Sequence, residues 1–322
     1  MPRVVAVLAL SIFVLGTSEF MITGLLPGMA RDLGVSVPQT GFLISAFAIG
    51  MIVGAPLMAV LTLRLPRRTT LVAALLVFVI GHVLGALASA YAVVLVSRVV
   101  TALATATFWV VAAVVTVSVA GERLRARALA VLLSGLTIST VLGIPLGTFV
   151  GQQWGWRATF WAVAALALAG LVGVLLTVPP RDEGAAAPRL SDELAVFRHG
   201  RLWLALGTTA LYQAGAISVF AYVSPLLTEV AGVQAAAVPV VLLGYGLGSL
   251  VGITIGGRLT DTHPWATLFA ALGAGAVIFV ALAMWADLPA VAIPLIVLLG
   301  FVAFLVAAPL NNRVFQLAGA AP

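Results

Sequence analysis

VVAVLALSIFVLGTSEFMITGLL, residues 4–26, is long and apolar enough to cross a lipid bilayer, and Glu19 is its one charged residue. A transmembrane helix needs about 20 mostly apolar residues, and runs of this length recur along the whole chain. Hydrophobic residues make up 63% of the chain and charged residues 8%, whereas a soluble domain carries about 25% charged residues. The sequence therefore predicts an all-α integral membrane protein. Its first run is a span, because it is too long for the apolar region of a signal peptide and lacks a small-residue cleavage site.

Ten apolar stretches qualify as spans. They fall at about 4–26, 40–62, 69–89, 91–119, 128–151, 158–178, 202–227, 236–257, 267–285 and 289–310. All 16 basic residues are arginine: thirteen lie in loops on one side, Arg31 and Arg157 lie in loops on the other, and Arg98 lies within the fourth span. Arginine-rich loops face the cytoplasm. We therefore expect a multi-pass protein of a bacterial inner membrane with both termini in the cytoplasm.

The chain contains a repeat with an offset of 198 residues, in which residues 27–69 align with residues 225–267 without a gap. Matched glycines and prolines are the most informative, since they reflect requirements of the backbone. They are Pro27/Pro225, Gly34/Gly232, Gly50/Gly248, Gly54/Gly252 and Pro66/Pro264. The second and eighth spans run in the same direction, so the two copies are parallel, as are the two halves of major facilitator transporters.

The repeat and the loops define the expected domains: a six-span half at 1–178, a cytoplasmic central loop at 179–201 and a four-span second half at 202–322. Residue 322 corresponds to residue 124, which follows the fourth span, so the second copy lacks two spans. We therefore expect a truncated chain, with a natural ten-span variant as the alternative. We also expect it to export poorly unless it is extended by two spans.

Five stretches resemble major facilitator drug/proton antiporters, in particular the bacterial chloramphenicol-resistance and sugar-efflux-like exporters. They are GTSEFMITGLLP (16–27), SAFAIGMIVGAPL (45–57), RLPRR (64–68), ALAVLLSGLTISTVLGIPLG (128–147) and GWRATFW (155–161). The resemblance extends over the whole chain and is densest in the first six spans. It implies a major facilitator fold and proton-coupled efflux of small hydrophobic drugs, most of all chloramphenicol-like antibiotics.

The family's gating motif after the second span, roughly G-x-x-x-D-R-x-G-R-R, reads AVLTLRLPRR at residues 59–68, with leucine in place of the aspartate. The resemblance leaves Arg64, Arg67 and Arg68 as gating candidates without their usual acidic partner. The second copy keeps Gly257 and Asp261, so Asp261 is the better candidate for a gating contact.

In the fifth span, Gly143, Pro145 and Gly147 are similar to the antiporter glycine–proline pattern, with altered spacing. Because glycine lets helices approach closely and proline interrupts the helical hydrogen bonds, we expect bending and close packing here, at the contact between the halves.

Glu19 and Arg98 are the candidates for proton coupling. Glu19 lies seven residues before the end of the first span, and Arg98 lies seven residues into the fourth. At 1.5 Å per residue, both lie roughly 10 Å below the same surface. A charge in the membrane costs on the order of 3 kcal/mol and usually faces a partner or a watery cavity. We expect the two side chains to face one another across the central cavity, directly or through water, so that proton binding and drug binding compete. The alternative is that Glu19 only bonds to neighbouring helices and Arg98 extends to the surface.

Phe108 and Trp109 in the fourth span and Tyr212 and Gln213 in the seventh could form an apolar cavity wall with hydrogen-bonding groups. Ordinary helix packing is an equal alternative for these four. His82 in the third span is most simply a packed polar residue.

The sequence is also compatible with three other functions: a sugar or metabolite exporter of the same fold, a ten-span drug/metabolite transporter and an inactive remnant. The parallel repeat argues against the second, which would have an inverted repeat. An intramembrane enzyme is disfavoured, because the chain has no cysteine, three histidines and neither an HExxH nor a GxSxG motif. We expect a monomer that binds a small hydrophobic molecule, protons and lipid. We expect it to use no cofactor, metal or nucleic acid, and to be driven by the proton gradient.

Overall fold

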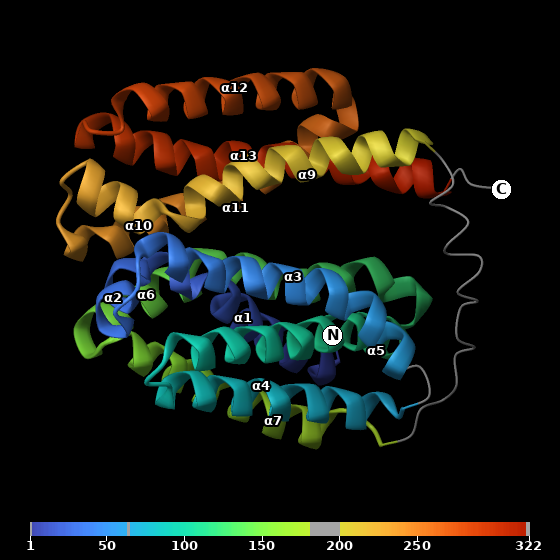
Figure 1. Cartoon of the computed structure of the whole chain (residues 1–322). Helices are drawn as coiled ribbons and strands as arrows, with labels where there is room; N and C mark the ends of the chain where they lie inside the picture. The colour runs from blue at the N-terminus through green and yellow to red at the C-terminus, as the bar shows by residue number, and fades with distance from the viewer. Residues whose placement is uncertain (1, 63–64, 181–199, 320–322) are drawn as a thin grey trace. The chain divides into compact units, whose positions relative to one another are not determined.

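The computed structural model describes residues 2–62, 65–180 and 200–319, and the chain divides into two compact units, Met1–Gly184 and Ala185–Pro322 (Figure 1). Every regular element within the described ranges is a helix. Ten of these helical segments are long and apolar enough to cross a membrane, which confirms the predicted class. The predicted central loop, 179–201, lies almost entirely outside the described residues.

The first unit contains six spans. Its elements are α1 (Arg3–Phe20), a 3-10 turn (Met21–Gly24), α2 (Leu26–Leu33), α3 (Val37–Thr62), α4 (Arg67–Leu87), α5 (Tyr91–Ile138), a π-helical turn (Ser139–Gly143), α6 (Ile144–Trp154) and α7 (Trp156–Thr177). Two spans meet within α5, at Gly121, whose φ of 67° lies in the left-handed region that glycine adopts without strain. This glycine separates the fourth span from the fifth.

The core of the first unit is built around α1. Leu8, Ile12 and Leu15 on this helix are fully buried, and α1 packs on both α5 and α7. α3 packs on α5, and α4 packs on α5 and α7. Large apolar side chains cover the outside of the helices, with Ile52 74% and Leu176 80% exposed. Such a surface suits lipid, where apolar exposure carries no hydrophobic penalty.

The second unit contains four spans. Its elements are α9 (Gly200–Ala221), α10 (Val223–Pro225), a π-helical turn (Leu226–Val230), a 3-10 turn (Ala235–Ala237), α11 (Val238–Thr262), α12 (Pro264–Trp285) and α13 (Pro289–Gly319). α13 is its central helix, because α9, α11 and α12 all pack on it.

The repeat is visible in the packing of each unit. A Cβ added at Gly50 on α3 would lie 3.5 Å from the carbonyl oxygen of Val99 on α5. A Cβ added at Gly248 on α11 would lie 2.6 Å from the carbonyl oxygen of Val297 on α13. Both partners of each pair are related by the same 198-residue offset. The second and fourth spans of each copy therefore pack in the same register, as the parallel repeat predicts.

Each predicted span overlaps a helix, but several ends differ. The eighth span is predicted to end at residue 257 and the tenth at residue 310, whereas α11 continues to Thr262 and α13 to Gly319. The seventh span was expected to end at residue 227, but α9 ends at Ala221. Pro225 has no backbone N–H to donate to the carbonyl of Ala221, four residues earlier, so a continuous helix would lose a bond there. Short α and π turns carry the chain onward instead.

Candidate functional site: a buried arginine at the end of the first span

A buried arginine connects two spans of the first unit. The side chain of Arg98, on α5, is 0% exposed. Its Nη1 donates to the carbonyl oxygen of Ser18 at 3.1 Å and to the Ser18 hydroxyl at 3.2 Å. Its Nη2 donates to the carbonyl oxygen of Glu19 at 3.2 Å. The guanidinium is therefore bound to the last turn of α1.

The local end of α1 explains this contact. α1 ends at Phe20 and is followed by the 3-10 turn of Met21–Gly24. The last carbonyls of an α-helix lack their usual N–H donors, and the negative end of the helix dipole favours a cation there. Arg98 supplies both the donors and the charge. Its Cζ also lies 4.3 Å from the ring centroid of Phe47 on α3, which adds a cation–π contact.

A histidine extends the polar cluster to a third span. His82, on α4, is fully buried. Its Nε2 lies 2.8 Å from the Ser18 hydroxyl and its Nδ1 lies 2.9 Å from the carbonyl oxygen of Phe78. The imidazole packs between the rings of Phe78 and Phe160, with centroids 4.2 and 5.6 Å away. The sequence predicted a packed polar residue here, but did not link it to Arg98.

Glu19 joins the cluster through its main chain. Its carbonyl oxygen accepts from Arg98, while its side chain is half-buried. The carboxylate of Glu19 attracts the guanidinium of Arg98, but the two do not approach within the 4 Å of an ion pair. Among the described residues, such a pair forms between Asp32 and Arg157. The structure therefore brings Arg98 into contact with the main chain of Glu19 without joining the two charged groups directly. The coupling role of the pair stays a prediction.

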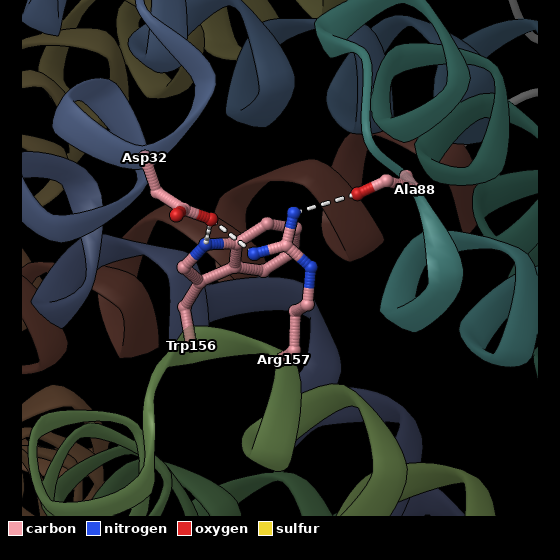
Figure 2. A network of polar contacts seen from close by, with 4 residues as sticks. All are labelled: Asp32, Ala88, Trp156 and Arg157. Carbon is pink, nitrogen blue, oxygen red and sulfur yellow. Dashed lines mark hydrogen bonds and ion pairs between the residues drawn. The ribbon is translucent and has the colours of Figure 1, made fainter.

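A second polar network ties together the ends of three elements of the first unit (Figure 2). Asp32 Oδ2 accepts from Arg157 Nη1 and, at 2.9 Å, from Trp156 Nε1. Arg157 Nη2 donates to the carbonyl oxygen of Ala88 at 2.7 Å, and its Cζ lies 4.3 Å from the centroid of the Trp156 ring. The Arg157 bond is the main cause that lowers the pKa of Asp32 below its ordinary value. This network joins α2, the α4–α5 connection and the start of α7.

The four predicted cavity residues are divided between the units. Phe108 is fully buried in the core of the first unit, and the half-buried Trp109 packs against that core. Tyr212 on α9 is 8% exposed, and its hydroxyl has no hydrogen-bond partner in the described part of the chain. Its ring lies 6.5 Å from that of Phe279. The neighbouring Gln213 is half-buried. Their contribution to a cavity stays a prediction.

The predicted gating residues lie in differing surroundings. Arg64 falls outside the described residues, and Arg67 is half-buried. Arg68 Nη2 donates to the carbonyl oxygen of Leu175 at 2.6 Å, so it caps the last turn of α7. In the second unit, Gly257 has open space around it and Asp261 is exposed. None of these observations tests the gating role.

The glycine–proline segment packs tightly on α1. A Cβ added at Gly143 would overlap the side chain of Thr17, and one added at Gly147 would lie 3.4 Å from Met21 Cβ. Gly143 closes the π-helical turn, and Pro145 lies in the first turn of α6. The segment thus combines an irregular helical turn with a close helix contact inside the first unit. Its expected contact with the other half stays a prediction.

No group of three or more histidine, cysteine, aspartate or glutamate side chains that could bind a metal occurs among the described residues. The chemistry that the buried cluster offers is therefore a fixed positive charge within a span, beside a half-buried carboxylate.

Sequence comparisons identify transporters. The profile of the Major Facilitator Superfamily matches residues 8–321. The chain is 42% identical to the "Chloramphenicol resistance protein" of Streptomyces lividans, over 100% of this chain and 83% of that protein. It is 36% identical to the "Inner membrane transport protein YdhP" of Escherichia coli strain K12, over 98% of this chain and 81% of that protein.

The fold agrees with these matches. The crystal structure of a D-xylose–proton symporter superposes with a TM-score of 0.76 at 18% identity, over 99% of this chain and 85% of that chain. A bacterial homologue of the human lysosomal transporter Spinster, in an inward-facing and unoccupied conformation, superposes with a TM-score of 0.74, also at 18% identity, over 98% and 78%. These likenesses support the major facilitator fold over a ten-span drug/metabolite transporter.

Proposed function

The chain belongs to the Major Facilitator Superfamily, and from this premise we propose that it exports small hydrophobic molecules, above all chloramphenicol-like antibiotics, in exchange for protons. The similarity over the full chain to a protein named for chloramphenicol resistance supports the substrate class. The other named relative is a transport protein without a stated substrate.

The observation that carries the proposal is the fully buried guanidinium of Arg98, bound to the main chain of Glu19. A charge within a span is expensive and marks a site of ion or substrate transfer in membrane proteins. Arg98 is held by three hydrogen bonds to α1, whereas no hydrogen bond to the Glu19 carboxylate occurs among the residues that the structure describes. The arginine is therefore the fixed charge, and the glutamate is the group that changes.

The proposed exchange follows from the balance between these two groups. The positive charge of Arg98 favours the ionised carboxylate, and removal of water from around Glu19 favours the protonated one. A drug whose hydrogen-bond donors bind the ionised Glu19 carboxylate requires the proton to leave, and a proton that binds there removes this acceptor from the drug. Binding of a drug and binding of a proton then compete, which is the requirement for antiport.

Transport in inside-out vesicles tests the proposal. Vesicles that contain the protein should accumulate labelled chloramphenicol when their interior is more acidic than the medium. An uncoupler should abolish the accumulation. Glu19→Gln should remove the dependence on the gradient, because an amide cannot carry the proton. Arg98→Ala should reduce accumulation at every pH.

A pump-deficient host provides the substrate profile. Cells that express the protein should tolerate more chloramphenicol, and florfenicol, a cationic dye and an arabinose analogue should be measured beside it. Resistance to the dye alone, or export of the sugar alone, would overturn the amphenicol assignment. Full activity of both Glu19→Gln and Arg98→Ala, at equal expression, would remove the coupling pair from the mechanism.

A further inference from the structure

Two polar residues of the buried cluster have no role in the exchange described above. The Ser18 hydroxyl lies between Arg98 Nη1, at 3.2 Å, and His82 Nε2, at 2.8 Å. His82 Nδ1 in turn lies 2.9 Å from the carbonyl oxygen of Phe78. These contacts form one continuous chain of hydrogen bonds from α5 through α1 to α4.

The groups at the two ends, the Arg98 guanidinium and the Phe78 carbonyl, determine which atom donates in each hydrogen bond of this series. A carbonyl oxygen can only accept, so Nδ1 of His82 carries a hydrogen and donates it to Phe78. In a neutral imidazole the other nitrogen, Nε2, is then an acceptor, and the Ser18 hydroxyl donates to it. A guanidinium can only donate, and the lone pairs of the Ser18 oxygen accept from Arg98. A neutral His82 therefore satisfies every bond in the chain.

A protonated His82 would break this order. Nε2 would become a donor, and the Ser18 oxygen would face two donors while its own hydrogen lost its acceptor. An unpaired buried donor is costly. A second positive charge would also lie one hydroxyl away from Arg98, in surroundings to which α7 contributes the ring of Phe160 and α3 the ring of Phe47. Glu19 is the one acidic side chain of α1, and it does not bond to the imidazole.

The backbone around His82 leaves little room for the ring to move. A Cβ added at Gly85 would lie 2.7 Å from the Phe160 ring, and one added at Gly81 would lie 2.6 Å from Thr101 Cγ2. These two glycines, one residue before and three residues after His82, bring α4 against α5 and α7. The acceptor nitrogen is therefore held at a fixed place opposite Ser18.

We propose that Ser18 and a permanently neutral His82 are positioning residues, which orient the guanidinium of Arg98 on the end of α1 through the Ser18 hydroxyl. The inference rests on the proposed function for its consequence in transport, because a displaced guanidinium no longer sets the charge beside Glu19. It also separates His82 from the proton path: the imidazole holds the site and does not carry the transported proton.

Four single variants and one double variant test this assignment in the vesicle assay, with initial rates measured against drug concentration and pH. Ser18→Ala and His82→Leu each remove the link and should lower the maximal rate about tenfold, the factor that corresponds to the loss of one hydrogen bond. The double variant should be no slower than either single variant, because both act through the same bond to Arg98.

His82→Gln is the rescue variant, since its side-chain oxygen can accept from Ser18 as Nε2 does. It should keep most of the rate and the pH profile of the parent protein. Ser11→Ala is the matched control: Ser11 is a buried serine of the same helix whose hydroxyl donates to the carbonyl of Val7, within its own helix. It should transport normally.

A spectroscopic readout keeps the inference testable if the protein moves neither drug nor proton. In protein labelled with ¹⁵N-histidine, the resonances missing from His82→Gln belong to His82. Its Nε2 should show the shift of an unprotonated nitrogen throughout the working pH range, and Ser18→Ala should move that shift.

Three results would overturn the inference. They are a protonated Nε2, a full rate in both Ser18→Ala and His82→Leu, and a flattened pH profile in His82→Gln. The last would make the imidazole a proton carrier. If the parent protein transports nothing but shows the expected ¹⁵N shifts, the proposed function would be refuted, while the hydrogen-bond chain from Arg98 through Ser18 to His82 would stand.

Discussion

Two adjacent glycines on α11 offer a sharp test of how the spans pack. A Cβ added at Gly256 would lie 2.8 Å from the carbonyl oxygen of Leu305 and 3.1 Å from its Cα, both on α13. A Cβ added at Gly257 would meet nothing within 4 Å. The change to alanine is chemically the same at both positions, so the two variants differ in this contact alone.

The expected magnitude follows from the two effects of the substitution. Alanine is favoured over glycine in a helix by about 1 kcal/mol, and this gain applies to both variants. At Gly256 the new methyl meets backbone atoms 2.8 and 3.1 Å away, which cannot rotate aside, so the two helices must separate by a few tenths of an ångström. Overpacking of this kind costs about 1–3 kcal/mol. We therefore expect Gly256→Ala to be less stable than Gly257→Ala by about 1–3 kcal/mol.

Unfolding in mixed detergent–SDS micelles, followed by circular dichroism, measures the difference. Both variants should be purified in the same detergent and titrated with SDS beside the parent protein. Gly257→Ala should unfold at the parent's SDS fraction or above it, and Gly256→Ala below it. Equal midpoints for the two variants would refute the close backbone approach of α11 and α13.

Three further outcomes follow from single contacts. Because bonds to Arg157 lower the pKa of Asp32, Asp32 stabilises the fold above its ordinary pKa, and this stability is lost as the pH falls through the lowered folded-state pKa. Asp32→Asn should therefore cost, at neutral pH, about 0.2–1 kcal/mol, small because the pair is exposed, and the difference from the parent should vanish in SDS titrations run in strong acid. Tyr212→Phe should unfold at the parent's midpoint or higher, since the hydroxyl it removes has no partner in the described residues; a loss of more than about 1 kcal/mol would indicate a hidden bond. Gly143→Ala should destabilise the protein by about 1–3 kcal/mol through overlap with Thr17, and adding Thr17→Ala should recover part of this loss; no recovery would place the strain elsewhere.

The spans were predictable because a membrane helix is defined by composition over a long window. Length and apolarity alone located ten helices, and the positions of glycines and prolines revealed their duplication. The predicted end of the seventh span was wrong because one residue decides the local backbone: Pro225 prevents α9 from continuing past Ala221. This effect does not change the hydropathy that defines the spans.

The sequence predicted that Glu19 and Arg98 lie near one another, but not which of their groups are in contact. The guanidinium of Arg98 meets the main chain of Glu19. The partners of Arg98 could not be foreseen, because they are main-chain carbonyls that become available only where α1 ends. His82 could have been found: it lies about two turns before the α4–α5 connection and Arg98 about two turns after it, so both have the same depth. One histidine in an apolar helix did not suggest this comparison.

The two copies of the repeat preserve packing and differ in chemistry. A Cβ at Gly54 would lie 3.5 Å from Leu103 Cα, and one at the equivalent Gly252 would lie 3.1 Å from Phe301 Cα, so the 198-residue register holds along this contact. The residues of the buried cluster are not repeated in the second copy. At the positions equivalent to Ser18, Phe47, His82 and Arg98, it has Ala216, Tyr245, Val280 and Ile296.

A buried isoleucine therefore occupies the position of the buried guanidinium, and an exposed valine that of the buried histidine. Close helix packing constrains both copies, because a methyl group at these glycines would force the spans apart. A buried charge is not needed for this packing, since the spans of the second copy pack without one among the side chains that the structure describes. A unit of this fold can therefore form without a residue such as Arg98 or its hydrogen-bond chain. Because a buried charge within a span costs free energy, we infer that Arg98 serves a function other than packing. The proposed proton exchange supplies that function and assigns it to the copy that holds the charge.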